Sequence, residues 1–305
     1  MADGVELNLG VGGETVATDD IGGEHHQRVK ISVGADGSAT DLSAAAPLPT
    51  GDTALALARG DVTGLSGVNK FGRATNVDSG VATDVWDGAN ATDDVDVWLA
   101  PTASRTHQVA SSSTADDGDP AGAGAQIVTI YGLQTWASSE SSESVTLDGT
   151  TNVPTANTYV IIHRMIVTAW GTSGPNVGKI TATADTDSTV TAQINAGEGQ
   201  TQMAVYGVPS GQTAYVQGYY ASAIKGTTAL SVSVKLLVNP VPDTVTTGFL
   251  TKHINGLATE GTNALHHCFY PYFSVTGPAI IKLQADSSAA DTDVSGGFDL
   301  VLDAN

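Results

Sequence analysis

Alternating apolar and polar residues dominate the stretch from Tyr159 to Val238. In its last run, apolar side chains occupy every second position from Leu230 to Val238, and Ser231, Ser233 and Lys235 fall between them. A period of two residues is typical of a β-strand that buries one face in a core. Five earlier runs are rich in Val, Ile, Tyr and Thr, and turn-forming segments such as GTSGPN, NAGEGQT and PSGQ separate them. Short strands that follow one another about every ten residues predict an antiparallel β-sandwich or jelly roll.

The same pattern extends over residues 61–305, which we expect to form one β-sandwich domain. Further strands are predicted at 95–110 (two short strands around a proline turn), 126–133, 144–149, 248–254, 265–273, 278–285 and 297–304. Residues 53–60 fit either one helical turn or a short strand. We find no longer helix and no repeat of fixed period, so the sequence predicts an all-β protein and disfavours a solenoid or propeller.

Residues 1–60 lack a convincing core pattern and are interrupted by glycines. One strand is predicted between His26 and Val33, and Asp36-Gly37 after it is typical of a tight turn. We interpret residues 1–60 as an extended N-terminal arm that orders against a partner and attaches the domain to it. The alternative is a flexible tail without a role.

The charge balance narrows the range of partners. The chain has 12 basic and 32 acidic residues and a net charge of −20. Such a surface repels phosphate backbones and anionic lipids, which argues against nucleic-acid binding and membrane insertion; adaptation to salt water is another source of acidity. Residues 1–10, MADGVELNLG, show no basic and apolar signal segment, so we expect no secretory signal. The one cysteine, Cys268, lies in an apolar-aromatic run and cannot form an intrachain disulfide.

Candidate catalytic residues are weak. Ser222 and Lys225 fit the spacing S-x-x-K, but that motif needs a helix to bring both side chains to one face, and here it follows a predicted strand. The adjacent pairs His25-His26 and His266-His267 point to opposite faces of a strand and cannot readily share a metal. His163 lies in an apolar strand and is expected to be a hydrogen-bonded core residue. We therefore expect no catalytic, cofactor-binding or metal-binding residues and no enzyme activity.

Acidic loops are the remaining candidates for a ligand. Asp116-Asp117-Gly118-Asp119, Asp185-Thr186-Asp187 and Asp291-Thr292-Asp293 offer oxygen atoms of the kind that Ca²⁺ prefers, although solvated loops are the simpler interpretation. Glycoside hydrolysis needs paired carboxylates in a cleft, but Glu140, Glu143 and Glu198 all fall in loops or turns. Among the few aromatic residues, Phe71 and Trp86 are expected to anchor polar segments on the core, or else to form contacts at an assembly surface.

Four segments carry a resemblance to a known group of proteins: VATDDIGGEHHQRVKISVGADG, GVNKFGRATNVDSGVATDVWDG, INAGEGQTQMAVYGVPSGQTAYV and GPAIIKLQADSSAADTDVSGGFDLVL. They resemble uncharacterised virion structural proteins of tailed bacteriophages, many of them marine, over nearly the whole chain. The resemblance implies a multi-copy exterior component of the head or tail, synthesised in the host cytoplasm, and brings no catalytic residues with it.

These observations lead to one expectation and two alternatives. The first is an exterior head protein, a capsid decoration or vertex fibre, that is held on other virion proteins by its N-terminal arm and forms a homo-oligomer. A tail component is the closest alternative. A module that binds host-surface glycan or protein is the other, with the loop at 111–125 and the aromatic run Phe269 to Phe273 as candidate contacts. Beyond these two, an enzyme, in the first instance a glycan hydrolase or lyase, is the third hypothesis and would require facing carboxylates in a deep cleft.

Overall fold

The computed structural model describes residues 4–6, 15–27, 32–33, 40–41, 53–224, 231–258 and 264–304 of the 305-residue chain. Within these residues the chain forms 21 strands and one helix, so the prediction of an all-β protein is confirmed. All pairings between these strands are antiparallel. The described part of the chain has no helix that is long and apolar enough to cross a membrane. The chain divides into two compact units, 1–59 and 60–305.

The first unit contains short strands and the helix. Strands β1 (Gly4–Glu6), β2 (Thr15–Ile21) and β3 (Glu24–Gln27) pair in that order, and β4 (Ser32–Val33) pairs with β5 (Thr40–Asp41). The strand predicted at 26–33 is thus described only at its ends, and its predicted Asp36-Gly37 turn lies outside the described residues. Helix α1 (Thr53–Arg59) decides the alternative at 53–60 in favour of helix. The role of this unit as an arm stays a prediction.

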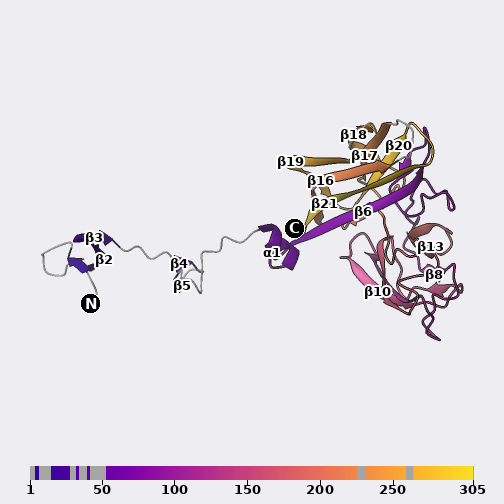
Figure 1. Ribbon diagram of the computed structural model, residues 1–305, viewed down its shortest axis with the longest axis horizontal. Coiled ribbons are helices and arrows are strands. Elements are labelled where there is room, and N and C mark those ends of the chain that lie inside the picture. Colours follow the sequence, from indigo (N-terminus) through magenta and orange to yellow (C-terminus); the bar gives the residue numbers. More distant parts are fainter. Residues whose placement is uncertain are drawn as a thin grey trace. The chain divides into compact units, whose positions relative to one another are not determined.

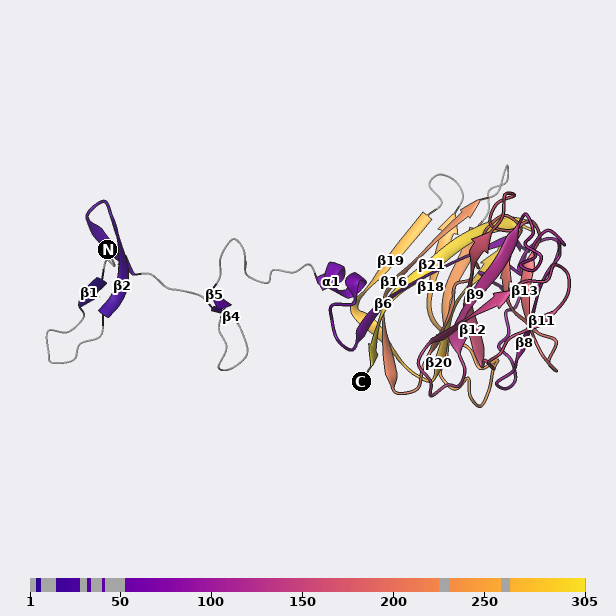
Figure 2. The same cartoon turned by 90° about the horizontal axis from the view of Figure 1, so that it is seen from below.

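The second unit contains a first β-sandwich whose strands come from both of its ends (Figures 1 and 2). One sheet has the order β19 (Ala264–Thr276), β16 (Gln212–Ile224), β21 (Thr292–Ala304), β6 (Leu65–Val77). The sheet packed against it has the order β15 (Val205–Val208), β20 (Ala279–Ser287), β17 (Ser231–Asn239), β18 (Leu250–Ala258), with β7 (Thr83–Asp84) beside β20.

A second, smaller sandwich is inserted between β7 and β15. Its sheets have the orders β10 (Ser141–Thr146), β9 (Ala125–Leu133), β12 (Ile161–Trp170) and β11 (Val153–Pro154), β8 (His107–Ser111), β13 (Ile180–Ala184), β14 (Val190–Ile194). β12 packs on β14. The sandwich architecture predicted for 61–305 is therefore present as two packed pairs of sheets, and a jelly-roll order stays a prediction. Strand pattern alone does not tell which sheet a strand joins, which is why one sandwich was expected.

One continuous apolar core runs through both sandwiches, from Ala74 to Leu300. β17 follows the predicted alternation, since Val232, Val234, Leu236 and Val238 are buried, whereas Leu230 lies outside the described residues. Buried side chains on alternate positions of a strand are what fix its register in the sheet.

The first of the two strands predicted at 95–110 is wrong. Residues 95–100 alternate between exposed and buried side chains but belong to no strand. Trp98 holds this segment instead: its backbone N–H donates to Asp84 (2.8 Å) and its indole N–H donates to the carbonyl of Thr191 (2.8 Å). Side-chain anchoring thus produces the alternation that a sheet would also produce.

Candidate functional site

The long strands β18 and β19 form one open side of the first sandwich, one at the outer end of each sheet. In the described structure, each pairs with a neighbour on one side only: β18 with β17, and β19 with β16. The free side of an outer strand presents backbone donors and acceptors that can pair with another chain. We call β18 and β19 together the open edge.

Aromatic and imidazole rings join the two strands of the open edge. The rings of His253 on β18 and His267 on β19 stack with centroids 4.1 Å apart. The hydroxyl of Tyr219, which is fully buried, lies 2.8 Å from Nδ1 of His253. Phe269 packs edge-on against both imidazoles, at 5.4 and 4.8 Å, and Phe273 lies 5.8 Å from Phe269. These five residues form a half-buried ring cluster that holds the outer ends of the two sheets together.

A bulge in β19 pushes aromatic side chains outward. Val216 pairs with Phe273 and Gly218 with Cys268, so four residues of β19 face a single residue of β16. The extra residues bend the strand and turn side chains away from the sheet. Tyr270 is 99% exposed and Tyr272 is 54% exposed, with Pro271 between them. The bulge therefore forms an aromatic knob, which we define as Tyr270, Pro271 and Tyr272.

The open edge also differs from the rest of the molecule in charge. Neither β18 nor β19 contains an Asp or Glu, although the chain carries 32. Lys252 and three of the seven histidines lie on these two strands. Burial, and then the neighbouring His267, lower the pKa of His253, so that imidazole is neutral at pH 7. An acidic protein that approaches this surface is therefore not repelled by carboxylates of β18 or β19.

Several carboxylates of the acidic loops accept hydrogen bonds or form ion pairs within the protein. The Asp116 side chain is fully buried and accepts four hydrogen bonds, from Ser111 Oγ and from the backbone N–H groups of Ala125, Val177 and Gly178. This anchoring organises the loop at 111–125 around Asp116. The role of the loop as a contact with a host surface stays a prediction.

The two other acidic loops are tied in the same manner. Asp185 accepts from Thr106 and Gln108, and Asp187 accepts from Thr102. Asp293 forms an ion pair with Arg73. In the described residues, no group of three or more His, Cys, Asp or Glu side chains is arranged to hold a metal ion. The expectation that these loops hold no metal stays a prediction, with calcium as its alternative.

The remaining candidates are separated from one another. His267 belongs to the ring cluster while His266 lies on the other face beside Cys268, as the alternation on a strand predicts. Ser222 lies on β16, and Lys225 falls outside the described residues. His163 is buried with Nε2 2.5 Å from Glu140, which fits the predicted core role.

The two aromatic anchors have different outcomes. Trp86 is fully buried and its indole N–H donates to the carbonyl of Val95 (2.9 Å), as predicted for a packing anchor. Phe71 is 41% exposed, so the core-anchor interpretation is wrong for this residue. It lies on β6 between Lys70 and Gly72, which are both buried, whereas its own ring is partly exposed.

Sequence reasoning singled out the run Phe269 to Phe273 but missed Tyr219 and His253 as its partners. These residues come from two other strands, and only the pairing of sheets brings them together. The absence of acidic residues from the two strands is the signal that would have located the open edge. The chain matches no protein-family model, and no curated protein is significantly similar to it.

Proposed function

We propose that this protein is a structural component of a tailed-phage virion, an exterior head protein that decorates the capsid or forms a vertex fibre. Residues 1–60 attach it to other virion proteins, and its copies associate with one another through the open edge. The sequence resemblance of the four segments supports the virion assignment. The observation that carries the assembly role is the exposed aromatic knob on an acid-free outer strand.

Charge favours a second copy as the occupant of the open edge. Two chains of net charge −20 repel each other over most of their surfaces. β18 and β19 are free of acidic residues, and tyrosine is among the side chains enriched in the centres of protein interfaces. Contact there brings apolar and ring surface together at the lowest electrostatic cost.

The division of the chain supports attachment through its N-terminal unit. Among the described residues the buried core cluster lies within 74–300, so residues 60–305 contain a core of their own. The attachment is tested with particles assembled in the presence of full-length protein or residues 60–305. We expect the shorter protein to fold, as seen by circular dichroism, and to be missing from purified particles. Its incorporation at the full-length level would refute attachment by the arm.

Association through the open edge is tested on full-length protein by light scattering after size-exclusion chromatography. We expect the double variant Tyr270→Ser and Tyr272→Ser to be shifted toward monomer. The matched control is Trp170→Ser, which removes another exposed ring, at the end of β12. An unchanged mass distribution in the tyrosine variant would contradict self-association at this surface.

A host-surface binding module is the second candidate, and the 99% exposure of Tyr270 favours it. Exposed tyrosine rings present an apolar face and a polar tip that suit sugars as well as proteins. A pull-down on host cells distinguishes the two candidates. If the protein is a binding module, the immobilised wild type captures host cells and the tyrosine variant does not. A pure assembly protein captures none.

A further inference from the structure

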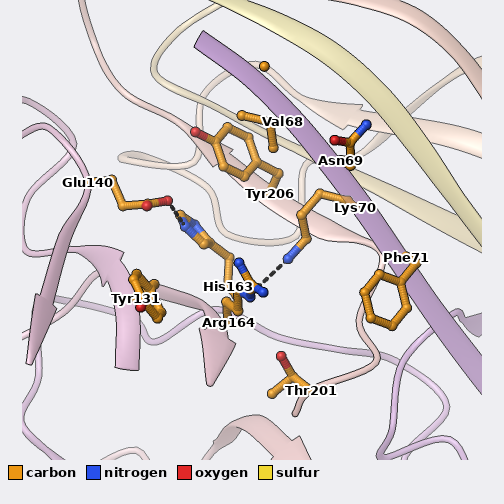
Figure 3. A pocket seen from close by; sticks show the side chains of 11 residues that line it. Val68, Asn69, Lys70, Phe71, Tyr131, Glu140, His163, Arg164, Thr201 and Tyr206 are labelled. Atoms are coloured by element: carbon orange, nitrogen blue, oxygen red, sulfur yellow. Dashed lines mark hydrogen bonds and ion pairs between the residues drawn. The ribbon is translucent and has the colours of Figure 1, made fainter. Parts of the chain in front are cut away.

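A pocket lies where the two sandwiches meet, on the side of β6 that faces the inserted sandwich. Its volume is about 470 Å³, and residues of β6, β9, β12 and β15 line it together with Glu140 and Thr201 (Figure 3). Pockets for small molecules occur preferentially between packed domains and fall in a range of about 300–1,000 Å³. The size and position of this pocket are therefore those of a ligand site.

A β-bulge in β12 directs two consecutive residues toward the pocket. Ile162 pairs with Gly132 and Arg164 with Tyr131, which leaves His163 without a partner in the ladder. Residues in a regular strand alternate between faces, but a bulge re-aims a side chain, and bulges are common beside binding sites. Here it brings both His163 and Arg164 to the pocket lining. The unpaired carbonyl of His163 accepts a hydrogen bond from Lys70 Nζ at 2.5 Å.

The pocket has more cationic than anionic groups. Lys70 is only 8% exposed, and this hydrogen bond uses one of its three ammonium donors. The one carboxylate in the lining, Glu140, lies 2.5 Å from His163 Nε2, whereas Nδ1 of His163 is buried without a hydrogen-bond partner. Arg164 adds a guanidinium 5.8 Å from the Tyr131 ring centre. In a protein of net charge −20, this is a local excess of positive charge.

We propose that this pocket binds a small ligand of about the size of one sugar residue that carries a carboxylate, held by the ammonium of Lys70 and the guanidinium of Arg164. The carboxylate accepts hydrogen bonds from the Lys70 donors that the His163 carbonyl does not take. It also accepts from the planar guanidinium of Arg164, one N–H of which lies 3.5 Å from Gln200 Oε1. Figure 3 shows Phe71 and Tyr131 on either side of these cations, and their rings provide apolar surface for the face of a sugar ring. The site is independent of the open edge and of the proposed virion role.

The titration of Lys70 gives the site a characteristic pH dependence. Burial is the main cause that lowers the pKa of Lys70 to about 7; Arg164 lowers it further, and Glu140 opposes both. The other titratable groups around it are His163, Tyr131 and Tyr206, all on the strands that line the pocket. Because a carboxylate binds the protonated ammonium, affinity is highest below pH 7 and falls as the pH rises through about 7.

The experiment is calorimetric titration of full-length protein with D-glucuronate at pH 6.0 and 8.5. D-glucose is the matched ligand, since it replaces the carboxylate by a hydroxymethyl group. Arg164→Gln removes an exposed cation without disturbing the core, and Lys70→Met keeps the buried aliphatic stem. Arg59→Gln, on α1 in the first unit, is the control variant.

We expect glucuronate to bind at pH 6.0, at least fivefold weaker binding at pH 8.5, and no measurable binding of glucose. Arg164→Gln and Lys70→Met should each weaken glucuronate binding at least tenfold, with Arg59→Gln unchanged. The proposal is overturned by absence of glucuronate binding at pH 6.0, by equal binding of glucose, or by unchanged affinity in Arg164→Gln. Arg164→Gln keeps the test decisive even where Lys70→Met fails to fold.

Discussion

The imidazole rings of His253 and His267 stack 4.1 Å apart although they belong to strands of different sheets. Two stacked imidazoles are compatible when both are neutral, and protonation places like charges in contact. The two outer strands are thus held together by a contact whose strength depends on pH. His267 precedes the aromatic knob on the same strand, β19.

We expect His253 to make the protein less stable in acid. Its pKa is lowered, chiefly by burial and next by His267, so the unfolded chain binds the proton more readily than the folded one. The stabilising contribution is complete above the unfolded pKa of about 6.5 and is lost as the pH falls below it. The variant His253→Gln keeps an acceptor for Tyr219. Its melting temperature should fall less between pH 7.5 and pH 5.5 than that of the wild type. His266→Gln is the control, and an equal loss in all three proteins would contradict the assignment.

His107 should contribute a second, larger acid sensitivity. Its ring is fully buried, Nδ1 lies 3.1 Å from the Arg105 carbonyl, and Nε2 has no partner. Burial lowers its pKa to about 4. Stability is therefore lost as the pH falls from about 6.5 toward 4, by roughly 3 kcal/mol at most. Urea unfolding of the wild type and of His107→Gln at pH 7 and pH 4.5 measures this, and the variant should show the smaller difference.

Asp116→Asn should destabilise the inserted sandwich strongly. The carboxylate accepts hydrogen bonds on both oxygens from four donors, and an amide NH₂ in place of one oxygen would face donors with a donor. We expect a loss of about 2–5 kcal/mol in the free energy of unfolding. The exposed neighbour provides the control, because Asp119→Asn should change stability by less than about 0.5 kcal/mol. Similar values for the two variants would show that Asp116 does not organise the loop.

The buried ion pair of Lys282 and Asp84 offers a test by a double variant. Nζ of Lys282 lies 2.5 Å from the Asp84 carboxylate and 4.0 Å from the Phe249 ring centre. Lys282→Met leaves a buried carboxylate without its cation and should cost about 3–5 kcal/mol. Adding Asp84→Asn removes the uncompensated charge, so the double variant should be more stable than Lys282→Met alone. Chemical unfolding measures both; a double variant that is less stable would contradict a charge-based cost.

The strands were predictable because burial of one face of a strand produces a local pattern of apolar and polar residues in the sequence. Alternation from Val232 to Val238 identified β17, and the apolar runs at 159–170 and 278–285 contain most of β12 and β20. The segment around Trp98 shows where prediction from this pattern fails. The same alternation arises there from one anchored indole, without a neighbouring strand.

The sites were not predictable because long-range pairing creates them. Lys70 donates a hydrogen bond to the carbonyl of His163, which lies 93 residues away in the sequence. A bulge in β12 leaves that carbonyl without a strand partner. Asp116 resembles a cation ligand in sequence, but its donors at Val177 and Gly178 come from 61 and 62 residues away. Phe71 reads as an anchor in a polar segment, yet on β6 its ring is partly exposed.

In the proposed association of copies through the open edge, the irregular centre of β19 opposes growth into an open-ended polymer. Uninterrupted main-chain pairing along an outer strand would let each added chain template the next, as in a fibril. Pro271 lacks the N–H that such a ladder requires, and four residues crowd against one at this point. A neighbour must accommodate a protruding, proline-containing turn, which favours a closed assembly with a fixed number of subunits over unlimited stacking.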